Sequence, residues 1–428
     1  MWRHDIVTEA DPLAGSGASS TTISRTLSAG RGSRVDATRR HNLSTILTAV
    51  HHHPGMSRAE LTRQTGLNRS TVGVLVAELA DLGLVREVAP AEHSSRGRPS
   101  PHVYPRTEVT VLAVNPDLDA VTIGLVGLGG TLHRRVRHEW KHAPTVDDTV
   151  EVVSRTFREL LAEADPNTVV LGAGVAVPGL IRSEGSFVVR APHLDWTDVP
   201  LGDLFAEALR VPVVIRNDAR VATIAESVFG AGRGVRDVVY INGSPSGIGG
   251  GAVVDGITLR GHAGFGGEMG HTTVAGGREQ CHCGRKGCLE TEVSLARLLA
   301  ALGRDSVDLV DLDDELARAG ADPTIRAEIQ RQLGVLAGTI GNVISIFNPE
   351  LVVLAGFLGS LYATAPTLLD NAVAKDSFAQ IWAGTRIERA QLGGRVHLVG
   401  AAELAFLPLL RDPASFSKMS GEGVGLLR

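Results

Sequence analysis

Three cysteines and a histidine, spaced as a metal site requires, stand together past the middle of the chain. Cys281, Cys283 and Cys288 are the only cysteines among 428 residues, and His271 lies a short loop upstream. Three thiolates and one imidazole complete a closed tetrahedral Zn²⁺ site that leaves no position open for catalysis. We therefore expect a structural zinc ion. The alternative is three unrelated thiols that share a loop.

Carboxylates stand on both sides of this group and at a second place in the chain. Glu268 precedes the histidine, and Glu290 follows the last cysteine. Asn217 and Asp218 follow the apolar run VPVVI after a single arginine, Arg216, and the run reads as a buried strand. Ligand sites of α/β proteins gather at the carboxyl ends of strands. Asp218 is therefore a candidate binding residue, although it could instead only cap the following helix.

The stretch E-x-G-H followed by C-x-C-G-x-x-G-C-x-E resembles the signature of the ROK family. That family joins sugar kinases to sugar-responsive transcriptional repressors, and the resemblance extends over about residues 40–411. It implies that His271 holds both zinc and a sugar hydroxyl, while Glu268 and Glu290 accept hydrogen bonds from other hydroxyls. Carboxylates and imidazoles are hydrogen-bond acceptors, so these side chains suit a sugar.

The same resemblance gives roles to residues of the first half. It implies that Asp218 matches the general base of ROK kinases and that Asn217 binds another sugar hydroxyl. Gly179, in AVPGLI, matches a loop that lies against the sugar ring. Arg220 stands where family members usually carry asparagine. We hypothesise that its charge narrows the pocket or selects a phosphorylated or acidic sugar.

The loops that would hold ATP depart from the kinase pattern. Phosphate-binding loops use backbone N–H groups, so glycine recurs in them and proline does not fit. Where ROK kinases have D-x-G-G-T, this chain has Asn115 to Asp119, NPDLD, and where they have G-T-G-x-G it has Pro245 to Gly249, PSGIG. A glycine pair on the adenosine side is reduced to Ala355-Gly356. An intact sugar side with an altered nucleotide side indicates a sensor.

The N-terminal region predicts a winged helix-turn-helix. Apolar residues from Leu43 recur at helical spacing. His51 to His53 should end this helix, because consecutive helical residues do not converge on a metal. Ser57 and Glu60 form a capping box for a short helix. Asn68 caps the next helix, which would be the recognition helix.

DNA binding follows from charge as well as from pattern. Residues 37–107 hold nine arginines and no lysine against five acidic residues, although the whole chain carries a net charge of −5. Arginine can read guanine or grip phosphate, and serine and threonine suit phosphates and base edges. The alternative is that these residues only cap helices and solubilise a linker. The predicted DNA-binding residues are Arg58, Asn68, Arg69, Ser70, Thr71, Gly73, Arg96 and Arg98.

Beyond this head, the strand pattern is repeated. Three strands, a helix and a buried strand follow residue 108, and the same order returns after residue 237. This duplication predicts two α/β lobes with a cleft, which is the actin-like, ribonuclease-H-like sugar kinase fold that the resemblance also implies. The predicted division is a disordered tail (1–36), a winged helix-turn-helix (37–90), a basic wing and linker (91–107), a first lobe (108–228), a second lobe with the zinc knuckle (229–399), and a helix returning to the first lobe plus a tail (400–428).

Composition sets the remaining expectations. No apolar run is long enough to predict a membrane span, and no secretion signal stands at the N-terminus, so we expect a cytoplasmic protein. We expect operator DNA and a sugar or sugar-phosphate effector as partners, in a homodimer or a dimer of dimers, because helix-turn-helix proteins read paired half-sites. Three hypotheses remain: a sugar-responsive repressor, a sugar kinase with an added DNA-binding head, and a regulator without ligand response.

Overall fold

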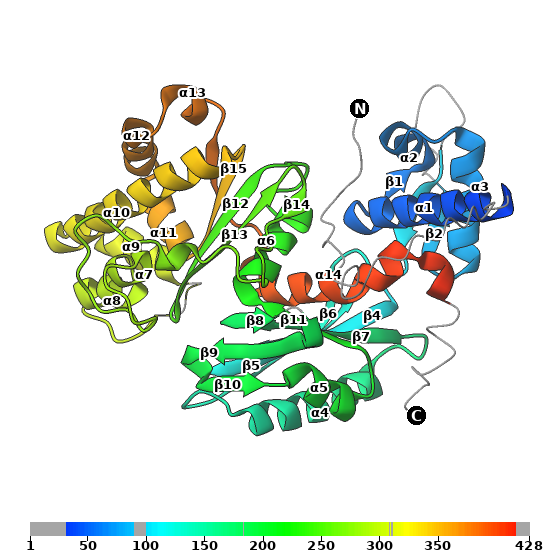
Figure 1. The fold of residues 1–428 in the computed structure, drawn as a ribbon, viewed down its shortest axis with the longest axis horizontal. Helices are drawn as coiled ribbons and strands as arrows, with labels where there is room; N and C mark the ends of the chain where they lie inside the picture. Colours follow the sequence, from blue (N-terminus) through cyan, green and yellow to red (C-terminus); the bar gives the residue numbers. More distant parts are fainter. Residues whose placement is uncertain (1–30, 90–99, 183, 308, 310, 417–428) are drawn as a thin grey trace, which may run out of the picture.

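The computed structural model describes residues 31–89, 100–182, 184–307, 309 and 311–416. It contains a helical head, a first lobe and a second lobe, with the C-terminal helix α14 (Val396–Arg411) running between them (Figure 1). The predicted fold class, a winged helix-turn-helix followed by a two-lobed α/β fold, is confirmed.

The head is built from three helices and a small sheet. Ser57 and Glu60 cap α2 reciprocally, and Asn68 accepts a hydrogen bond from the backbone of Thr71 to cap α3. Gly66 ends α2 with φ of 71°, a conformation that favours glycine. The sheet has the order β1-β3-β2. The elements are α1 (Arg31–His52), β1 (Met56–Ser57), α2 (Arg58–Thr65), α3 (Arg69–Asp81), β2 (Val85–Val88) and β3 (His102–Pro105).

The structure corrects one prediction for the head, and the residues of another lie outside the described part of the chain. Helix α1 begins at Arg31, so the prediction of a disordered tail was wrong for residues 31–36. The first residues of α1 are mostly polar. They carry no apolar periodicity, so the sequence did not reveal that the helix begins there. Residues 1–30 and 90–99, with Arg96 and Arg98, lie outside the described residues.

The first lobe is a five-stranded sheet with helices on both faces. Its strand order is β11-β7-β4-β5-β6, in which β4, β5 and β6 are antiparallel and β7 and β11 run parallel to β4. Helices α4 and α5 pack on one face of the sheet, and α14 packs on the other. The elements are β4 (Val109–Pro116), β5 (Ala120–Gly127), β6 (Thr131–Glu139), α4 (Val146–Glu163), β7 (Val169–Val177), α5 (Leu201–Leu209), β11 (Val213–Asn217) and α6 (Asp218–Phe229), with a smaller sheet of β8 (Leu180–Arg182), β9 (Phe187–Ala191) and β10 (Trp196–Val199).

The second lobe repeats this arrangement. Its sheet has the order β14-β13-β12-β15-β16, again with three antiparallel strands followed by two parallel ones. The long helix α10 provides the largest share of its core. The elements are β12 (Val238–Ser244), β13 (Gly247–Val254), β14 (Ile257–Thr258), α7 (Leu289–Glu292), α8 (Leu295–Leu302), α9 (Leu312–Ala319), α10 (Pro323–Phe347), β15 (Leu351–Gly356), α11 (Phe357–Thr364), α12 (Pro366–Asp376), α13 (Ala379–Trp382) and β16 (Arg386–Arg389).

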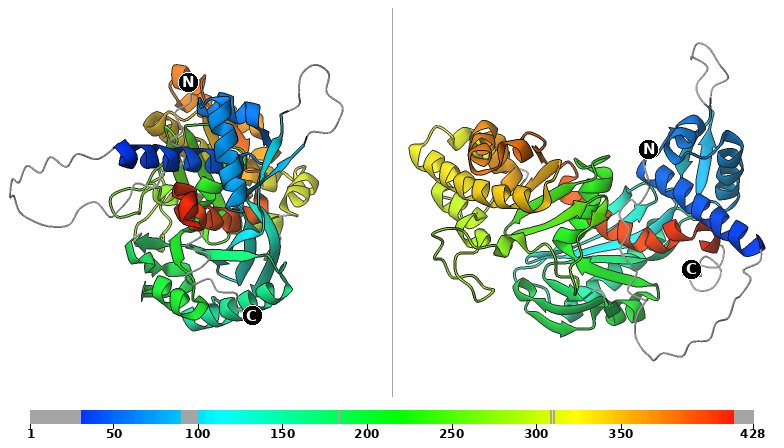
Figure 2. Two further views of the ribbon diagram at one scale, coloured as in Figure 1. Left: turned by 90° about the vertical axis from the view of Figure 1, so that its right-hand side faces the viewer. Right: turned by 45° about the horizontal axis from the view of Figure 1, so that its top comes forward.

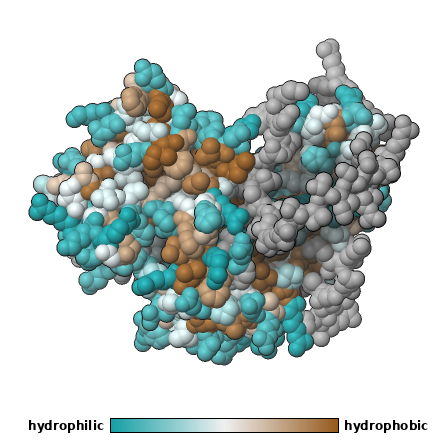
Figure 3. Space-filling model, in the orientation of Figure 1, coloured by the Kyte–Doolittle hydropathy of each residue, from teal (hydrophilic) through white to brown (hydrophobic). Residues whose placement is uncertain are grey.

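Helix α14 joins the head to the lobes. It contacts α6, β7 and β4 on one side and α1 on the other, and Figure 2 shows α1 and α14 side by side. One hydrophobic core runs from the head helices through the first sheet to α14. The segment Gly393–Arg411 is apolar and long enough to cross a membrane, but 61% of it is buried inside the fold. Its apolar character is therefore explained by packing. The visible surface mixes hydrophilic and hydrophobic residues (Figure 3).

Candidate functional site

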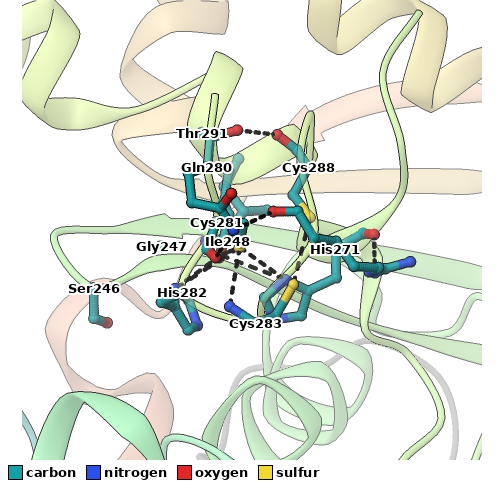
Figure 4. Close-up of polar contacts among 12 residues, drawn as sticks. Ser246, Gly247, Ile248, His271, Gln280, Cys281, His282, Cys283, Cys288 and Thr291 are labelled. Atoms are coloured by element: carbon teal, nitrogen blue, oxygen red, sulfur yellow. Dashed lines mark hydrogen bonds and ion pairs between the residues drawn. The ribbon is translucent and has the colours of Figure 1, made fainter. Parts of the chain in front are cut away.

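The three cysteines and His271 converge at one point of the second lobe (Figure 4). The sulfurs of Cys283 and Cys288 are 3.7 Å apart, and the Cys281 sulfur is 3.6 Å from His271 Nδ1. In a zinc tetrahedron with Zn–S bonds of about 2.3 Å, sulfurs lie about 3.8 Å apart and sulfur and nitrogen about 3.6 Å apart. The four ligand atoms all lie within 4.8 Å of one another. The residues therefore fit the predicted ion.

His271 faces two ways. It ends a short 3₁₀ turn (Met269–His271), with Nδ1 toward the thiols and Nε2 3.9 Å from Glu268. Glu290 lies on the other side, at the start of α7, and its carboxylate is 3.4 Å from His271 Nδ1 and accepts a hydrogen bond from the Cys281 thiol. A metal ion on Nδ1 would leave Nε2 carrying the proton, and therefore free to donate to a ligand hydroxyl.

Asn217 and Asp218 stand where β11 passes into α6. The side chain of Asn217 accepts a hydrogen bond from the Arg220 backbone, so Asn217 is the residue that caps α6. Its amide also donates to the Gly179 carbonyl at 3.0 Å and to the Asp218 carboxylate at 3.1 Å. These contacts bring Gly179 next to the pair. The alternative role for Asp218, as the helix cap, is thereby taken by its neighbour Asn217.

The carboxyl groups influence one another electrostatically. Burial raises the pKa of Glu268 to about 7, and the negative charges of Asp218 and Glu290 add to the shift. Burial also raises the pKa of Asp218, which His397 opposes. These interactions place Glu268, from the second lobe, near Asp218 of the first lobe and near Glu290 of its own lobe. Near neutral pH, the Glu268 carboxyl can therefore donate as well as accept a hydrogen bond.

The two altered turns have well-defined roles in the fold. Pro245 and Ser246 form the two-residue turn between β12 and β13, where Ser244 pairs with Gly247. A Cβ atom at Gly247 would lie 2.5 Å from a Glu290 carboxylate oxygen, so this glycine is required beside the site. In the other turn, the Asn115 amide donates to the Ala176 carbonyl at 3.0 Å, which ties β4 to β7.

Two histidines near the site were not singled out from the sequence. His193, in a 3₁₀ turn of the first lobe (Pro192–Leu194), stacks edge-on against His282 of the cysteine loop, with ring centroids 4.7 Å apart. The His282 ring is also 3.2 Å from the Glu290 carboxylate. The position of His282 between Cys281 and Cys283 could have identified it from the sequence, whereas no sequence pattern identifies His193. Arg220 is buried on α6, with 3% of its surface exposed.

In the head, some of the predicted DNA-binding side chains already have partners within the protein. The Arg58 guanidinium is bound by both carboxylate oxygens of Glu87, and the Asn68 carbonyl oxygen is occupied by capping. The Ser70 hydroxyl donates to Asn68 at 2.6 Å. Arg69 is exposed at the start of α3, and Thr71 and Gly73 are half-buried on the same helix.

A buried cluster of two histidines and one glutamate lies between α1 and α14. His51 Nε2 and His52 Nε2 lie 2.7 Å and 2.8 Å from the two carboxylate oxygens of Glu403, and none of the three side chains is more than 4% exposed. Helix α1 ends at His52, as predicted. The prediction that adjacent histidines do not converge on a metal stays a prediction; what the structure adds is a shared carboxylate that gives each imidazole its own oxygen.

Comparison with known proteins adds independent evidence. The model of the ROK family matches residues 118–406, and that of the MarR family matches residues 44–96. The xylose repressor of Caldicellulosiruptor bescii is 27% identical over 392 residues, which are 86% of this chain and 96% of that protein. The glucokinase of Thermotoga maritima is 31% identical over 261 residues, 57% of this chain and 81% of that enzyme. A crystal structure of a ROK family transcriptional regulator, described as a homologue of the Escherichia coli MLC protein, has the same fold, with a TM-score of 0.70 at 24% identity over 90% of this chain and 99% of that one.

Proposed function

This chain belongs to the ROK family, and we propose that it is a sugar-responsive transcriptional repressor. One observation carries the proposal: a MarR-like head precedes a sugar kinase fold whose sugar side is intact and whose phosphate turns contain proline. The xylose repressor covers the head as well as the lobes, with 86% of this chain aligned, whereas the glucokinase aligns with 57% of it.

The effector would be a sugar or a sugar derivative held between the lobes. Asn217 and Asp218 approach it from the first lobe, with Gly179 fixed beside them by the Asn217 amide. Glu268, His271 and Glu290 approach it from the second lobe. Carboxylates, an amide and an imidazole together can accept hydrogen bonds from neighbouring hydroxyls and donate hydrogen bonds to them. Whether Arg220 selects a phosphorylated or acidic sugar stays a hypothesis, which an Arg220→Asn variant with unchanged selectivity would refute.

The zinc ion would be structural. Cys281, Cys283, Cys288 and His271 would hold it, and they are the only ligands it needs. When bound, the ion supplies a fixed tetrahedral centre. His271 then keeps one orientation, with its second nitrogen directed toward Glu268 and the ligand.

We propose that the chain does not phosphorylate its sugar. Pro116 and Pro245 have no N–H group to offer a phosphate, and Asp117 and Asp119 would repel one. The competing function is sugar phosphorylation. Asp218 favours it, because burial raises the pKa of its carboxyl toward the range of a general base. A phosphorylation assay with ATP and each bound sugar separates the two.

The response would travel through connected helices. Asp218 is the first residue of α6, α6 packs along α14, and α14 carries Glu403 to the end of α1 in the head. A sugar that favours one arrangement of the lobes would therefore shift the head and change its affinity for operator DNA. We expect the repressor to act as a homodimer on paired half-sites, in the cytoplasm.

Isothermal titration with a panel of sugars and sugar phosphates tests the sensor directly, using the wild-type chain and Asp218→Ala. Heat from one compound that is lost in the variant would support the proposal and identify the signal. Absence of heat across the panel, with zinc bound, would favour a DNA-binding protein without a sugar effector.

A further inference from the structure

The outer face of helix α3 carries an apolar residue that the fold does not need. The buried face of this helix consists of Val72, Leu75, Val76 and Leu79, which enter the core of the head. Val74 lies outside this pattern, and 66% of it is exposed. It shares the outer face with Ser70 and Ala77, since residues three and four apart stand above one another on a helix.

Gly73, beside Val74, gives an independent reason to expect close contact on this face. Among the described residues, a Cβ atom added at Gly73 would meet nothing nearer than the Arg58 guanidinium at 3.5 Å, an ordinary contact distance. Glycine inside a helix is less favourable than alanine. The packing of the head therefore does not explain why a glycine stands here. A surface that must approach the helix backbone from outside would.

Some of the nearby polar side chains already have partners within the head, so they do not account for all contacts of α3 with the bases. Arg58 is held by Glu87, and the Asn68 oxygen caps the helix. Arg69 and Ser70 remain at the first turn, suited to phosphates and base edges. Val74 is one turn further along, where a recognition helix lies in the major groove. It can offer a base only an apolar contact.

We propose that Val74 reads the C5-methyl group of thymine in the operator, with Gly73 letting the helix approach the base pair. Thymine is the base that presents a methyl group in the major groove, so an exposed valine there discriminates it from cytosine and from either purine. This inference rests on the proposed DNA-binding function and names a base that the operator should contain. Ala77 continues the same face toward the end of the helix.

The contact can be tested by removing the methyl group from either partner. A duplex is first selected from a random library with the full-length wild-type chain. Each thymine of that duplex is then replaced by deoxyuridine, which keeps base pairing and lacks only the methyl. Burial of one methyl-sized group predicts about a fourfold loss of wild-type affinity at the contacted thymine. The variant Val74→Ala should bind the thymine and deoxyuridine duplexes equally.

A matched control and the alternative outcomes make the test decisive. Val254, 40% exposed on β13 of the second lobe, gives the control Val254→Ala, which should keep the full methyl effect. A deoxyuridine penalty that is the same in Val74→Ala as in the wild type would overturn the assignment, and so would a wild-type chain indifferent to every replacement. If no duplex is enriched at all, the proposed DNA-binding function fails with it.

Discussion

Replacing Glu403 by alanine should loosen the attachment of the head to the lobes. The substitution leaves His51 and His52 buried without their shared acceptor, in the core that joins α1 to α14. Because His51 and His52 hold the pKa of Glu403 far below its usual range despite burial, the wild-type cluster contains a carboxylate. Removing one partner from a buried ionic cluster costs about 3–5 kcal/mol.

Hydrogen exchange measures this loss where it occurs. A local loss of about 3–5 kcal/mol corresponds to amide exchange roughly 10²- to 10⁴-fold faster, so long as opening is the limiting equilibrium. The acceleration should appear in α1 and in the half of α14 that contacts it, and not in α10 of the second lobe. The control Glu163→Ala removes an exposed partner of Arg134 and should leave exchange unchanged.

The variant Glu403→Gln keeps the size of the side chain and replaces one of its two acceptor oxygens by an amide donor. His51 Nδ1 accepts a hydrogen bond from the Gly129 backbone at 2.8 Å, so its Nε2 must carry a proton and needs an acceptor. His52 Nδ1 has no such partner in the part of the chain that the structure describes, so His52 can carry its proton there and accept a hydrogen bond from the glutamine amide through Nε2. Glutamine should therefore accelerate exchange less than alanine. Equal exchange in wild type and Glu403→Ala would refute the account of this cluster.

Further predictions concern the proposed sugar site and the proposed zinc site. Asp218→Asn should raise the thermal unfolding temperature at pH 7 while it weakens sugar binding. Burial raises the folded-state pKa of Asp218, so the stability of the wild type falls as pH rises above the ordinary carboxyl pKa of about 3.9. The stability advantage of asparagine should therefore shrink as pH is lowered toward that value. A lower unfolding temperature for the variant than for the wild type at pH 7 would contradict this. The purified chain should contain about one zinc ion, and Cys288→Ser should lose it. Sugar affinity in that variant, measured by titration, should fall with zinc content, and full affinity without zinc would refute the positioning role of the metal. Incubation with ATP and the bound sugar should yield no sugar phosphate, and turnover that Asp218→Ala abolishes would instead favour a kinase.

Features encoded within a few residues of one another were readable from the sequence. The four residues that could hold a metal ion lie between positions 271 and 288, and the capping box of Ser57 and Glu60 spans one helical turn. The repeated strand order of the two lobes was also readable from the sequence, because each lobe has its own apolar pattern. Asn217 was assigned to binding, and the structure adds that it caps α6.

Contacts between distant parts of the chain were not readable in this way. Glu403 lies 352 residues from His51, and neither residue type predicts the pairing. The assignment of Arg58 to DNA stays a prediction, and the structure adds an ion pair with Glu87 of β2 that the sequence did not reveal. Val74 looked like one more apolar helical residue. Only the direction of its side chain, set by the packing of α3, separates it from the core.

The proposed function requires that sugar binding and DNA binding be linked, and fluorescence anisotropy of the selected duplex measures this link. The affinity of the wild-type chain is measured without sugar and at saturation with the sugar identified by titration. We predict a change of about 5- to 150-fold, the usual range of allosteric coupling. Asp218→Ala should keep the sugar-free DNA affinity and show no response. An affinity for DNA that saturating sugar leaves unchanged in the wild type would contradict the account.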